Sequence, residues 1–258
     1  MRIISLSVDG IHQAASRGLY DWIAKQDADI VCLQDLRALE SELDHAVFHP
    51  EGYYSYFFDS GIKHYNGVAI YTRHAPKALI YGLGFASGVD MEGRYLQVDF
   101  ERYSIGTLLA PCAQAENESL EVKLKFFEDM QALMHKITRK RRHFIFCGNW
   151  AMAHTRKDVQ NWQEHISTPG FLPQEQQWLN QAFNQLGYAD AFRQVNKDMD
   201  EFSWWPSGQI DKGCGWRTDY HIISEALKRK VEYATIYKTQ EFSSHLPVVI
   251  DYDIDDLV

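Results

Sequence analysis

Short apolar runs separated by turn-forming residues dominate this sequence. The runs are rich in Val, Ile, Leu, Phe and Tyr, a pattern typical of buried or half-buried β-strands. The pattern predicts strands over residues 2–7, 29–33, 53–58, 67–72, 77–82, 95–100, 104–109, 143–147, 218–223, 231–236 and 246–252.

Three longer segments follow the helical period instead. Residues 15–26 carry an apolar face of Leu19, Trp22 and Ile23, and residues 119–137 begin at Ser119, a favourable N-cap. The apolar stripe of that second helix is Leu120, Leu124, Phe127, Met134 and Ile137. A third helix is predicted from Pro173 to a stop at Gly187. Its inward residues are predicted to be Trp178, Leu179, Ala182, Phe183 and Leu186.

Many short strands with few helices argue against a simple parallel sheet. The order of strands and helices also roughly recurs in the two halves of the chain. We therefore expect an α/β (α+β) protein, a four-layer α/β/β/α sandwich, with residues 1–258 forming a single domain.

The composition argues against a membrane-spanning protein and against a secreted one. No apolar stretch approaches the roughly 18 residues that a membrane helix needs, and the N-terminus lacks a signal-peptide pattern. Four dispersed cysteines without a Cys-x-x-Cys pair indicate reduced thiols, so we expect a cytoplasmic location. The net charge of −9 would repel nucleic acid globally, so any nucleic-acid binding must be local or assisted by a partner.

One concentrated basic run stands out against this acidic background. We call it the basic cluster; it consists of Lys136, Arg139, Lys140, Arg141 and Arg142. It is either a solvated helix end whose cations complement the helix dipole, or a surface that contacts RNA or a partner protein.

Several short motifs resemble the exonuclease III/apurinic endonuclease superfamily. They are Ser5-Leu6-Ser7-Val8-Asp9-Gly10, Leu33-Gln34-Asp35, Asn66-Gly67-Val68-Ala69, Gly93-Arg94-Tyr95, Asp190-Ala191-Phe192-Arg193, Phe202-Ser203-Trp204 and Arg217-Thr218-Asp219. The resemblance covers nearly the whole chain in order, and it implies the exonuclease III-like (DNase I-like) fold.

Four positions depart from the catalytic pattern of that superfamily. Leu109 stands where the superfamily has a catalytic tyrosine, and Asn149 where it has the aspartate that activates water. Ala151 replaces an asparagine that orients phosphate, and Ser244 replaces the aspartate before His245. An amide is not a base near neutral pH, and each lost donor or base costs roughly 10²–10⁴-fold in rate. The pattern predicts no intact catalytic site, no metal cofactor, and a His245 left without an orienting carboxylate.

What remains of the predicted pocket is Gln34, Asp35, Asp219 and His245. Three of these residues also have a structural explanation: Asp35 as a loop cap, Asp219 as an ion-pair residue, and His245 as a core histidine. Trp204-Trp205 could likewise stack nucleobases or simply pack in the core.

One regulatory branch of the superfamily is similar from end to end, the catabolite repression control proteins of gammaproteobacteria. The similarity includes Cys32-Leu33-Gln34-Asp35, Gly82-Leu83-Gly84-Phe85, Phe202-Ser203-Trp204-Trp205-Pro206, Gly215-Trp216-Arg217 and Val249-Ile250-Asp251-Tyr252-Asp253. The resemblance implies a post-transcriptional regulator without nuclease activity. It also implies that the protein acts with the RNA chaperone Hfq on A-rich mRNA and binds RNA weakly alone.

Two enzymatic alternatives stay open. The first is an active exodeoxyribonuclease III or apurinic/apyrimidinic endonuclease that uses Mg²⁺ with Asp35, Asp219, His245 and, as a compensating ligand, Asp9. The second is a phosphatase acting on a small phosphoester.

Overall fold

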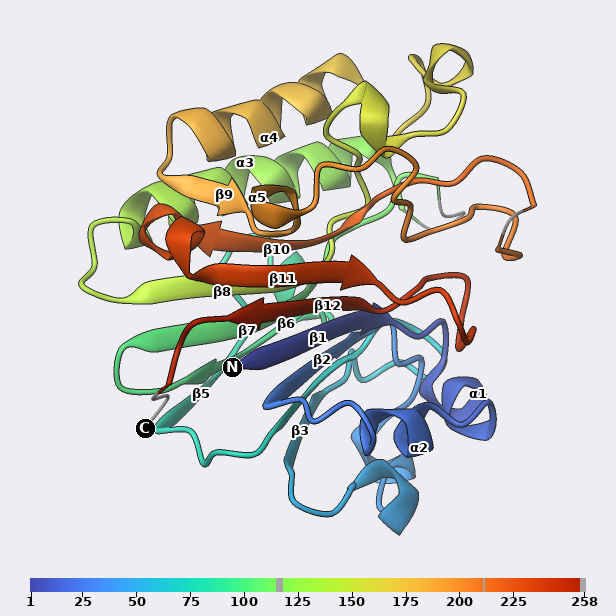
Figure 1. The fold of residues 1–258 in the computed structure, drawn as a ribbon, viewed down its shortest axis with the longest axis vertical. Helices are drawn as coiled ribbons and strands as arrows, with labels where there is room; N and C mark the ends of the chain where they lie inside the picture. The colour runs from blue at the N-terminus through green and yellow to red at the C-terminus, as the bar shows by residue number, and fades with distance from the viewer. Residues whose placement is uncertain (115–117, 211, 256–258) are drawn as a thin grey trace.

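Two six-stranded sheets form the centre of the computed structural model, which describes residues 1–114, 118–210 and 212–255 (Figure 1). Sheet A has the strand order β11 (Val231–Ile236), β12 (Val248–Tyr252), β1 (Arg2–Ser7), β2 (Ile30–Gln34), β4 (Val68–Thr72) and β3 (Tyr54–Phe58). Sheet B has the order β5 (Ala78–Tyr81), β6 (Tyr95–Asp99), β7 (Tyr103–Leu109), β8 (His143–Asn149), β10 (Asp219–Ser224) and β9 (Tyr188–Asp190).

Each sheet has one parallel strand pair at its centre and antiparallel neighbours outside it. β1 pairs with β2 in sheet A, and β7 pairs with β8 in sheet B. Parallel strands need a crossover connection, and helices supply both. The first crossover contains α1 (Ile11–Ser16) and α2 (Leu19–Ile23), and the second contains α3 (Leu120–Ile137). The two halves of the chain therefore repeat one arrangement, as expected from the sequence.

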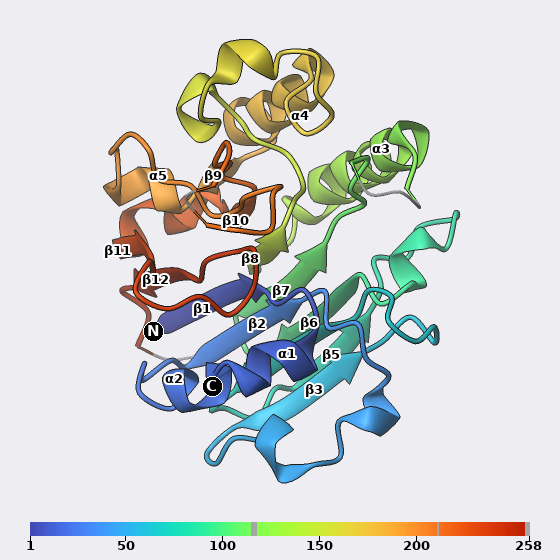
Figure 2. The same cartoon turned by 90° about the vertical axis from the view of Figure 1, so that its right-hand side faces the viewer.

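Helices cover the outer face of each sheet, which gives four layers (Figure 2). Residues such as Ile3, Cys32, Val98 and Cys147 fill the space between the sheets. A second core lies beneath α1 and α2, and a third lies beneath α3 and α4 (Pro173–Asn184). The predicted α/β/β/α sandwich is confirmed.

The remaining helical elements are short. They are α5 (Phe192–Val195), η1 (Glu40–Glu42), η2 (Ala46–Phe48), η3 (Val89–Met91), η4 (Arg156–Asp158), η5 (Trp162–Glu164) and η6 (Glu225–Lys230). None of the described helices combines the length and the apolar character that crossing a bilayer would require.

The sequence located most strands and both long helices correctly, but it missed α5 and the 3-10 helices, and it failed at two further elements. The single helix expected over residues 15–26 is wrong: α1 begins earlier, and Gly18 separates it from α2 with a left-handed φ of 85°. Strand β9 was not predicted, because its three residues are too short to show a period. The helix expected from Ser119 is confirmed, and the Ser119 hydroxyl accepts a hydrogen bond from the Val122 N–H.

A buried ion pair joins the two helices that cover sheet B. Lys123 of α3 is 1% exposed; its Nζ lies 2.5 Å from the Glu175 carboxylate of α4 and donates to the Ala151 carbonyl at 2.6 Å. The Glu175 carboxylate also accepts from the backbone N–H groups of Gly170 and Leu172. Lysine is seldom fully buried, but this pair holds Lys123 in the core, on the same side of α3 as Phe127 and Met130.

Replacing Lys123 with Met should leave the Glu175 charge buried without its partner. Breaking a buried pair in this way costs about 3–5 kcal/mol, so Lys123→Met should lower the free energy of unfolding measured in urea by that amount. Lys125→Met removes an exposed lysine of the same helix, paired with Glu128 and Asp129, and should lower the free energy of unfolding far less than Lys123→Met does. Equal effects of the two substitutions would contradict the structural role of Lys123.

Candidate functional site

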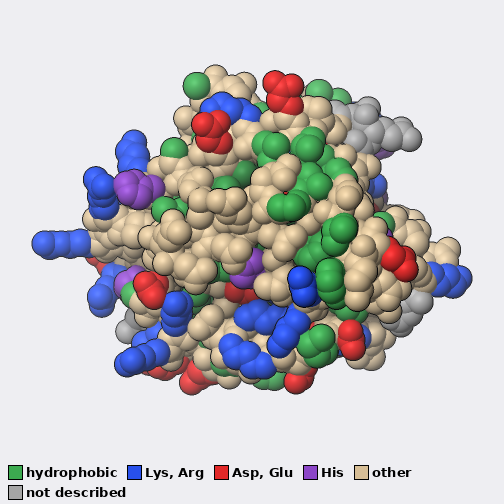
Figure 3. All heavy atoms as spheres, turned by 90° about the horizontal axis from the view of Figure 1, so that it is seen from above, with side chains coloured by type: hydrophobic (Ala, Val, Ile, Leu, Met, Phe, Trp, Pro, Cys, Tyr) green, Lys and Arg blue, Asp and Glu red, His purple; other side chains and the backbone are tan. Residues whose placement is uncertain are grey.

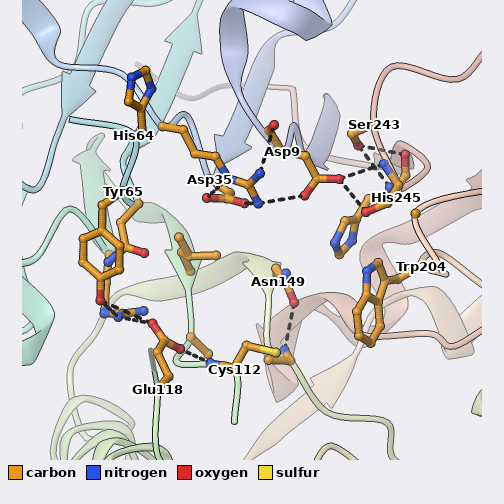
Figure 4. Close-up of a pocket in the computed structure, with 18 of the residues that line it drawn as sticks. Asp9, Asp35, His64, Tyr65, Cys112, Glu118, Asn149, Trp204, Ser243 and His245 are labelled. Carbon is orange, nitrogen blue, oxygen red and sulfur yellow. Dashed lines mark hydrogen bonds and ion pairs between the residues drawn. The ribbon is translucent and has the colours of Figure 1, made fainter. Parts of the chain in front are cut away.

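A cavity of about 490 Å³ opens at the edge where the central strands of both sheets end (Figure 4). It contains six of the predicted site residues together with the alternative ligand Asp9. The six are Asp35, Leu109, Asn149, Ala151, Ser244 and His245. They follow or end β1, β2, β7 and β8, or lie just before β12. The sandwich therefore brings together residues that are far apart in the sequence.

Gln34 and Asp219 do not line the cavity themselves. Gln34 is fully buried, and its amide donates to the hydroxyls of Ser5 and Thr107, so it links the two sheets. Asp219 lies behind His245. Both residues lie behind the side chains that line the cavity and contact the structure that supports them.

An arginine that the sequence analysis missed controls the charge of the cavity. The Arg37 guanidinium holds both oxygens of the Asp35 carboxylate, with Nη2 at 2.6 Å from Oδ2 and Nε at 3.2 Å from Oδ1. The same Nη2 lies 3.5 Å from Asp9 Oδ1. Burial raises the pKa of Asp35, and Arg37 opposes that shift. The sequence does carry a signal for this contact, because Arg37 lies only two residues after the candidate metal ligand Asp35.

Ser244 engages the second carboxylate of the cavity. Its backbone N–H donates to Asp9 Oδ2 at 2.8 Å, and its hydroxyl donates to the same oxygen. Burial alone would raise the pKa of Asp9, but His245 and the hydrogen bonds from Ser244 outweigh it and lower that pKa. Ser244 is thus a partner for Asp9.

His245 does have an orienting carboxylate, contrary to the prediction made from Ser244. His245 Nδ1 lies 2.9 Å from Asp219 Oδ2, and the Asp219 carboxylate also accepts from the Ser203 hydroxyl at 2.6 Å. Burial by itself lowers the pKa of His245, but Asp219, with help from Asp9 and Asp35, raises it above 6.5. The prediction failed because the supporting carboxylate comes from β10, which sequence spacing alone could not pair with His245.

Trp204 stacks on His245 at one wall of the cavity. The two ring centroids are 5.7 Å apart, with an interplanar angle of 21°. Trp205, in contrast, is buried in the core between the sheets. Of the two tandem tryptophans, Trp204 therefore lines the cavity and Trp205 packs in the core.

Asn149 and Leu109 complete the wall opposite Asp35. Asn149 Oδ1 accepts from the Ala151 backbone N–H at 2.9 Å, which leaves the NH₂ end of the amide unbonded by that contact. Leu109 contributes only apolar surface. This side of the cavity offers an amide donor, and neither residue can remove a proton from water.

Backbone strain concentrates around this cavity. Among the residues that the structure describes, nine non-glycine residues have positive φ, and six of them line the cavity: Asp9, Asp35, Arg37, His64, Asn66 and Ala151. Such conformations cost of order 1–3 kcal/mol each and cluster at functional sites. The chain thus maintains an unfavourable backbone to form this pocket.

The Mg²⁺ ion that the superfamily implies does not fit the side chains as they stand. Hard cations need free carboxylate oxygens, but Arg37 binds both oxygens of Asp35, and Asp9 is shared between Ser244 and Arg37. Asp219 is committed to His245 and Ser203. Within the described ranges, no group of three or more His, Cys, Asp or Glu is arranged to hold a metal ion.

Two arginines from motifs shared with the superfamily have structural partners. Arg217, fully buried, donates to Asp158 at 2.8 Å and to Asp190 at 2.7 Å, and Arg193 donates to Asp158 at 2.9 Å. This network ties β9, α5 and β10 to the loop after β8. These buried contacts give Arg193 and Arg217 a structural role.

The basic cluster lies at the other end of the molecule. The 18-residue helix α3 begins beside the cavity-lining Glu118 and ends at Ile137, about 27 Å away at 1.5 Å per residue. Several Lys and Arg side chains project from this end, on the left of Figure 3. Four members of the cluster are exposed, whereas Arg142 is half-buried and donates to the carbonyls of Phe100 and Tyr103.

Comparison with known proteins supports the resemblance seen in the motifs. The chain matches the Endonuclease/Exonuclease/phosphatase family over residues 8–238. It is 30% identical to an exodeoxyribonuclease of Bacillus subtilis (strain 168), covering 98% of this chain and 100% of that protein. It is 27% identical to a DNA-(apurinic or apyrimidinic site) endonuclease of Dictyostelium discoideum, covering 99% of this chain and 71% of that protein.

A solved structure carries the same fold. An AP endonuclease from Archaeoglobus fulgidus matches with a TM-score of 0.86 at 22% identity, covering 98% of this chain and 100% of that one. The exonuclease III-like architecture expected from the sequence is confirmed, whereas similarity to the regulatory branch stays a prediction.

The His245–Asp219 pair predicts a pH dependence. A raised folded-state pKa means that the pair stabilises the fold fully below pH 6.5 and loses this contribution as pH rises through the folded-state pKa. In an NMR titration, His245 should titrate above 6.5, and Asp219→Asn should lower its midpoint. His221, whose pKa burial lowers to about 3, should stay neutral throughout and serve as the internal control. A His245 midpoint at or below 6.5 would count against the pair.

The Arg37 contacts predict how the cavity responds to divalent cations. Arg37→Met should free the carboxylates of Asp35 and Asp9 and remove a positive charge, so Mn²⁺ affinity, measured by electron paramagnetic resonance, should rise by about tenfold or more. Arg17→Met removes another arginine from the cavity wall, one that donates to the Phe242 carbonyl, and should leave the affinity unchanged. Adding Asp35→Asn to Arg37→Met should abolish the gain; equal affinity in wild type and Arg37→Met would refute the assignment.

Proposed function

The chain belongs to the endonuclease/exonuclease/phosphatase family, and we propose that it is a member that binds nucleic acid without cutting it. The observation that carries the proposal is the set of side chains that line the cavity. Arg37 holds the Asp35 carboxylate, and an amide, Asn149, stands where a base would be needed.

Phosphodiester hydrolysis requires an activated water and stabilisation of the charge that develops on phosphate. Asn149 cannot take a proton, and Leu109 offers no donor. His245 can still donate a hydrogen bond, since Asp219 holds its Nδ1 side. The cavity therefore retains groups that bind a phosphate more readily than groups that split one.

The exposed basic cluster suits a partner-assisted contact with RNA. Lys136, Arg139, Lys140 and Arg141 form a local positive surface on a chain of net charge −9. Phosphate contacts would be few, so intrinsic RNA affinity would be low and a second protein would be needed to hold the RNA. We propose that this partner is Hfq, bound to A-rich mRNA.

The full proposal is a cytoplasmic post-transcriptional regulator that uses no cofactor. By resemblance to the catabolite repression control proteins, it would help Hfq repress translation of catabolic mRNAs. Its support is the sequence similarity to that branch together with the cavity chemistry and the basic cluster.

An alternative function is favoured by two observations. The relatives named above are an exodeoxyribonuclease and an apurinic/apyrimidinic endonuclease, and the His245–Asp219 pair is intact. Under this alternative the protein is a Mg²⁺-dependent nuclease in which Arg37 releases Asp35 when substrate and metal bind.

In a gel-shift titration, this protein should add to a preformed complex of Hfq and A-rich RNA and give a slower band. Arg139→Glu/Arg141→Glu should weaken that step and reduce the slope of log affinity against log salt by about 1.4, or about 0.7 per lost phosphate contact. Lys25→Glu/Lys197→Glu makes the same charge change at exposed sites outside the cluster and should bind like wild type. Absence of the slower band with wild-type protein would refute the regulatory proposal.

Incubation with Mg²⁺ and abasic or nicked duplex DNA separates the two functions. The binding proposal expects no cleavage above background. Cleavage that disappears in both Asp35→Ala and Asp219→Ala would establish the nuclease alternative.

A further inference from the structure

The open side of the sandwich presents an aromatic surface that lies outside the cavity and only partly packs against the core. β3 and β5 are the outermost strands of sheets A and B, and they lie along the same side of the molecule (Figure 2). β3 carries Tyr54 and Tyr56, and β5 carries Tyr81. We call these three residues the tyrosine cluster.

The tyrosines belong to one patch. Residues two apart on a strand share a face, which places Tyr54, Tyr56 and Phe58 together. Phe58 meets Tyr81 with ring centroids 5.3 Å apart in an edge-to-face contact. Burial raises the pKa of Tyr56, and the phenols of Tyr54 and Tyr81 raise it further.

The patch is unusually open for aromatic residues. Tyr54 is 50% exposed and Tyr81 is 45% exposed, and their neighbour Ile80 is 40% exposed. An edge strand with exposed apolar side chains is a liability unless something binds there. The tyrosine cluster therefore has the character of a binding surface.

Positive charge adjoins the patch. Ile80 points to the opposite face of β5 from Tyr81, where a crevice of about 150 Å³ separates the strand from the end of α3. Lys140 and Arg142 of the basic cluster line the same crevice; Arg142 lies 3.7 Å from Asp99 there, and Lys140 is exposed. A ligand that passes around the free edge of β5 would thus meet aromatic rings on one side and cations on the other.

We propose that the tyrosine cluster is a base-stacking platform for single-stranded RNA whose phosphates contact the basic cluster. Single-stranded nucleic acids bind where aromatic rings lie beside a positively charged track, because every base offers a face for stacking. An apolar protein segment would use the tyrosines but has no need of the adjoining cations. The inference rests on the proposed function, since it specifies how the RNA of that complex would be held.

Affinity of this protein for a preformed complex of Hfq and A-rich RNA tests the platform. Tyr54→Ala/Tyr81→Ala should weaken binding by about 5- to 100-fold, the loss typical of one stacked base, with an unchanged salt slope because stacking releases no counterions. Tyr54→Phe/Tyr81→Phe keeps both rings and should bind within about twofold of wild type, following the same principle. Tyr233→Ala removes an equally exposed tyrosine (50%) from β11 at the far edge of sheet A and should have no effect.

A second measurement distinguishes failure of the platform from failure of the proposed function. In NMR spectra with an A-rich oligoribonucleotide alone, ring signals of Tyr54 and Tyr81 should shift upfield, and those of Tyr233 should not. If no complex with Hfq forms but these shifts appear, the regulatory role is lost and the platform stands. Absence of the shifts, or a double Ala variant that binds like wild type, overturns the platform. A loss of binding to Hfq without RNA would identify a protein contact instead and overturn it too.

Discussion

Two parallel strand pairs, one at the centre of each sheet, bring together the cavity residues that end or follow β1, β2, β7 and β8. β1 and β2 end at the same edge as β7 and β8, because the sheets stack through one shared apolar core. Gln34 reinforces the stacking by donating across the interface to Thr107. Once the sheets pack in this register, Asp9, Asp35, Leu109 and Asn149 must meet, whatever chemistry their side chains carry.

The regular parts of this arrangement were predictable from the sequence, because strand and helix periods are local properties. Nearly all strands and the helices beginning at Leu120 and Pro173 follow directly from apolar spacing. Tertiary pairing overrides the preference of a residue type elsewhere: lysine is normally exposed, yet Glu175 from another helix makes the burial of Lys123 possible. Gly18 interrupts a helix that the apolar face alone would have continued.

The site was predictable as a set of positions, but its electrostatics were not. Motif order identified the strand ends, and six of the predicted residues do line one cavity. Which charges pair there depends on side-chain directions across strands. His245 finds its carboxylate on β10, and Arg37 turns back onto Asp35 from only two residues away. The motifs identified Asp35, Asp219 and His245, but they did not show that Asp219 pairs with His245 or that Arg37 contacts Asp35.

The strained backbone around the cavity bears on where function now lies. Six positive-φ residues follow from the strand-end turns that the fold requires, so the pocket can persist after its chemistry has changed. A retained pocket therefore says little about catalysis by itself. The side of the molecule formed by β3 and β5 is different, since the core does not require the exposed side chains of Tyr54 and Tyr81 or a run of cations after α3. Residues that the fold does not need, placed beside one another, are the stronger indication of a function at that surface.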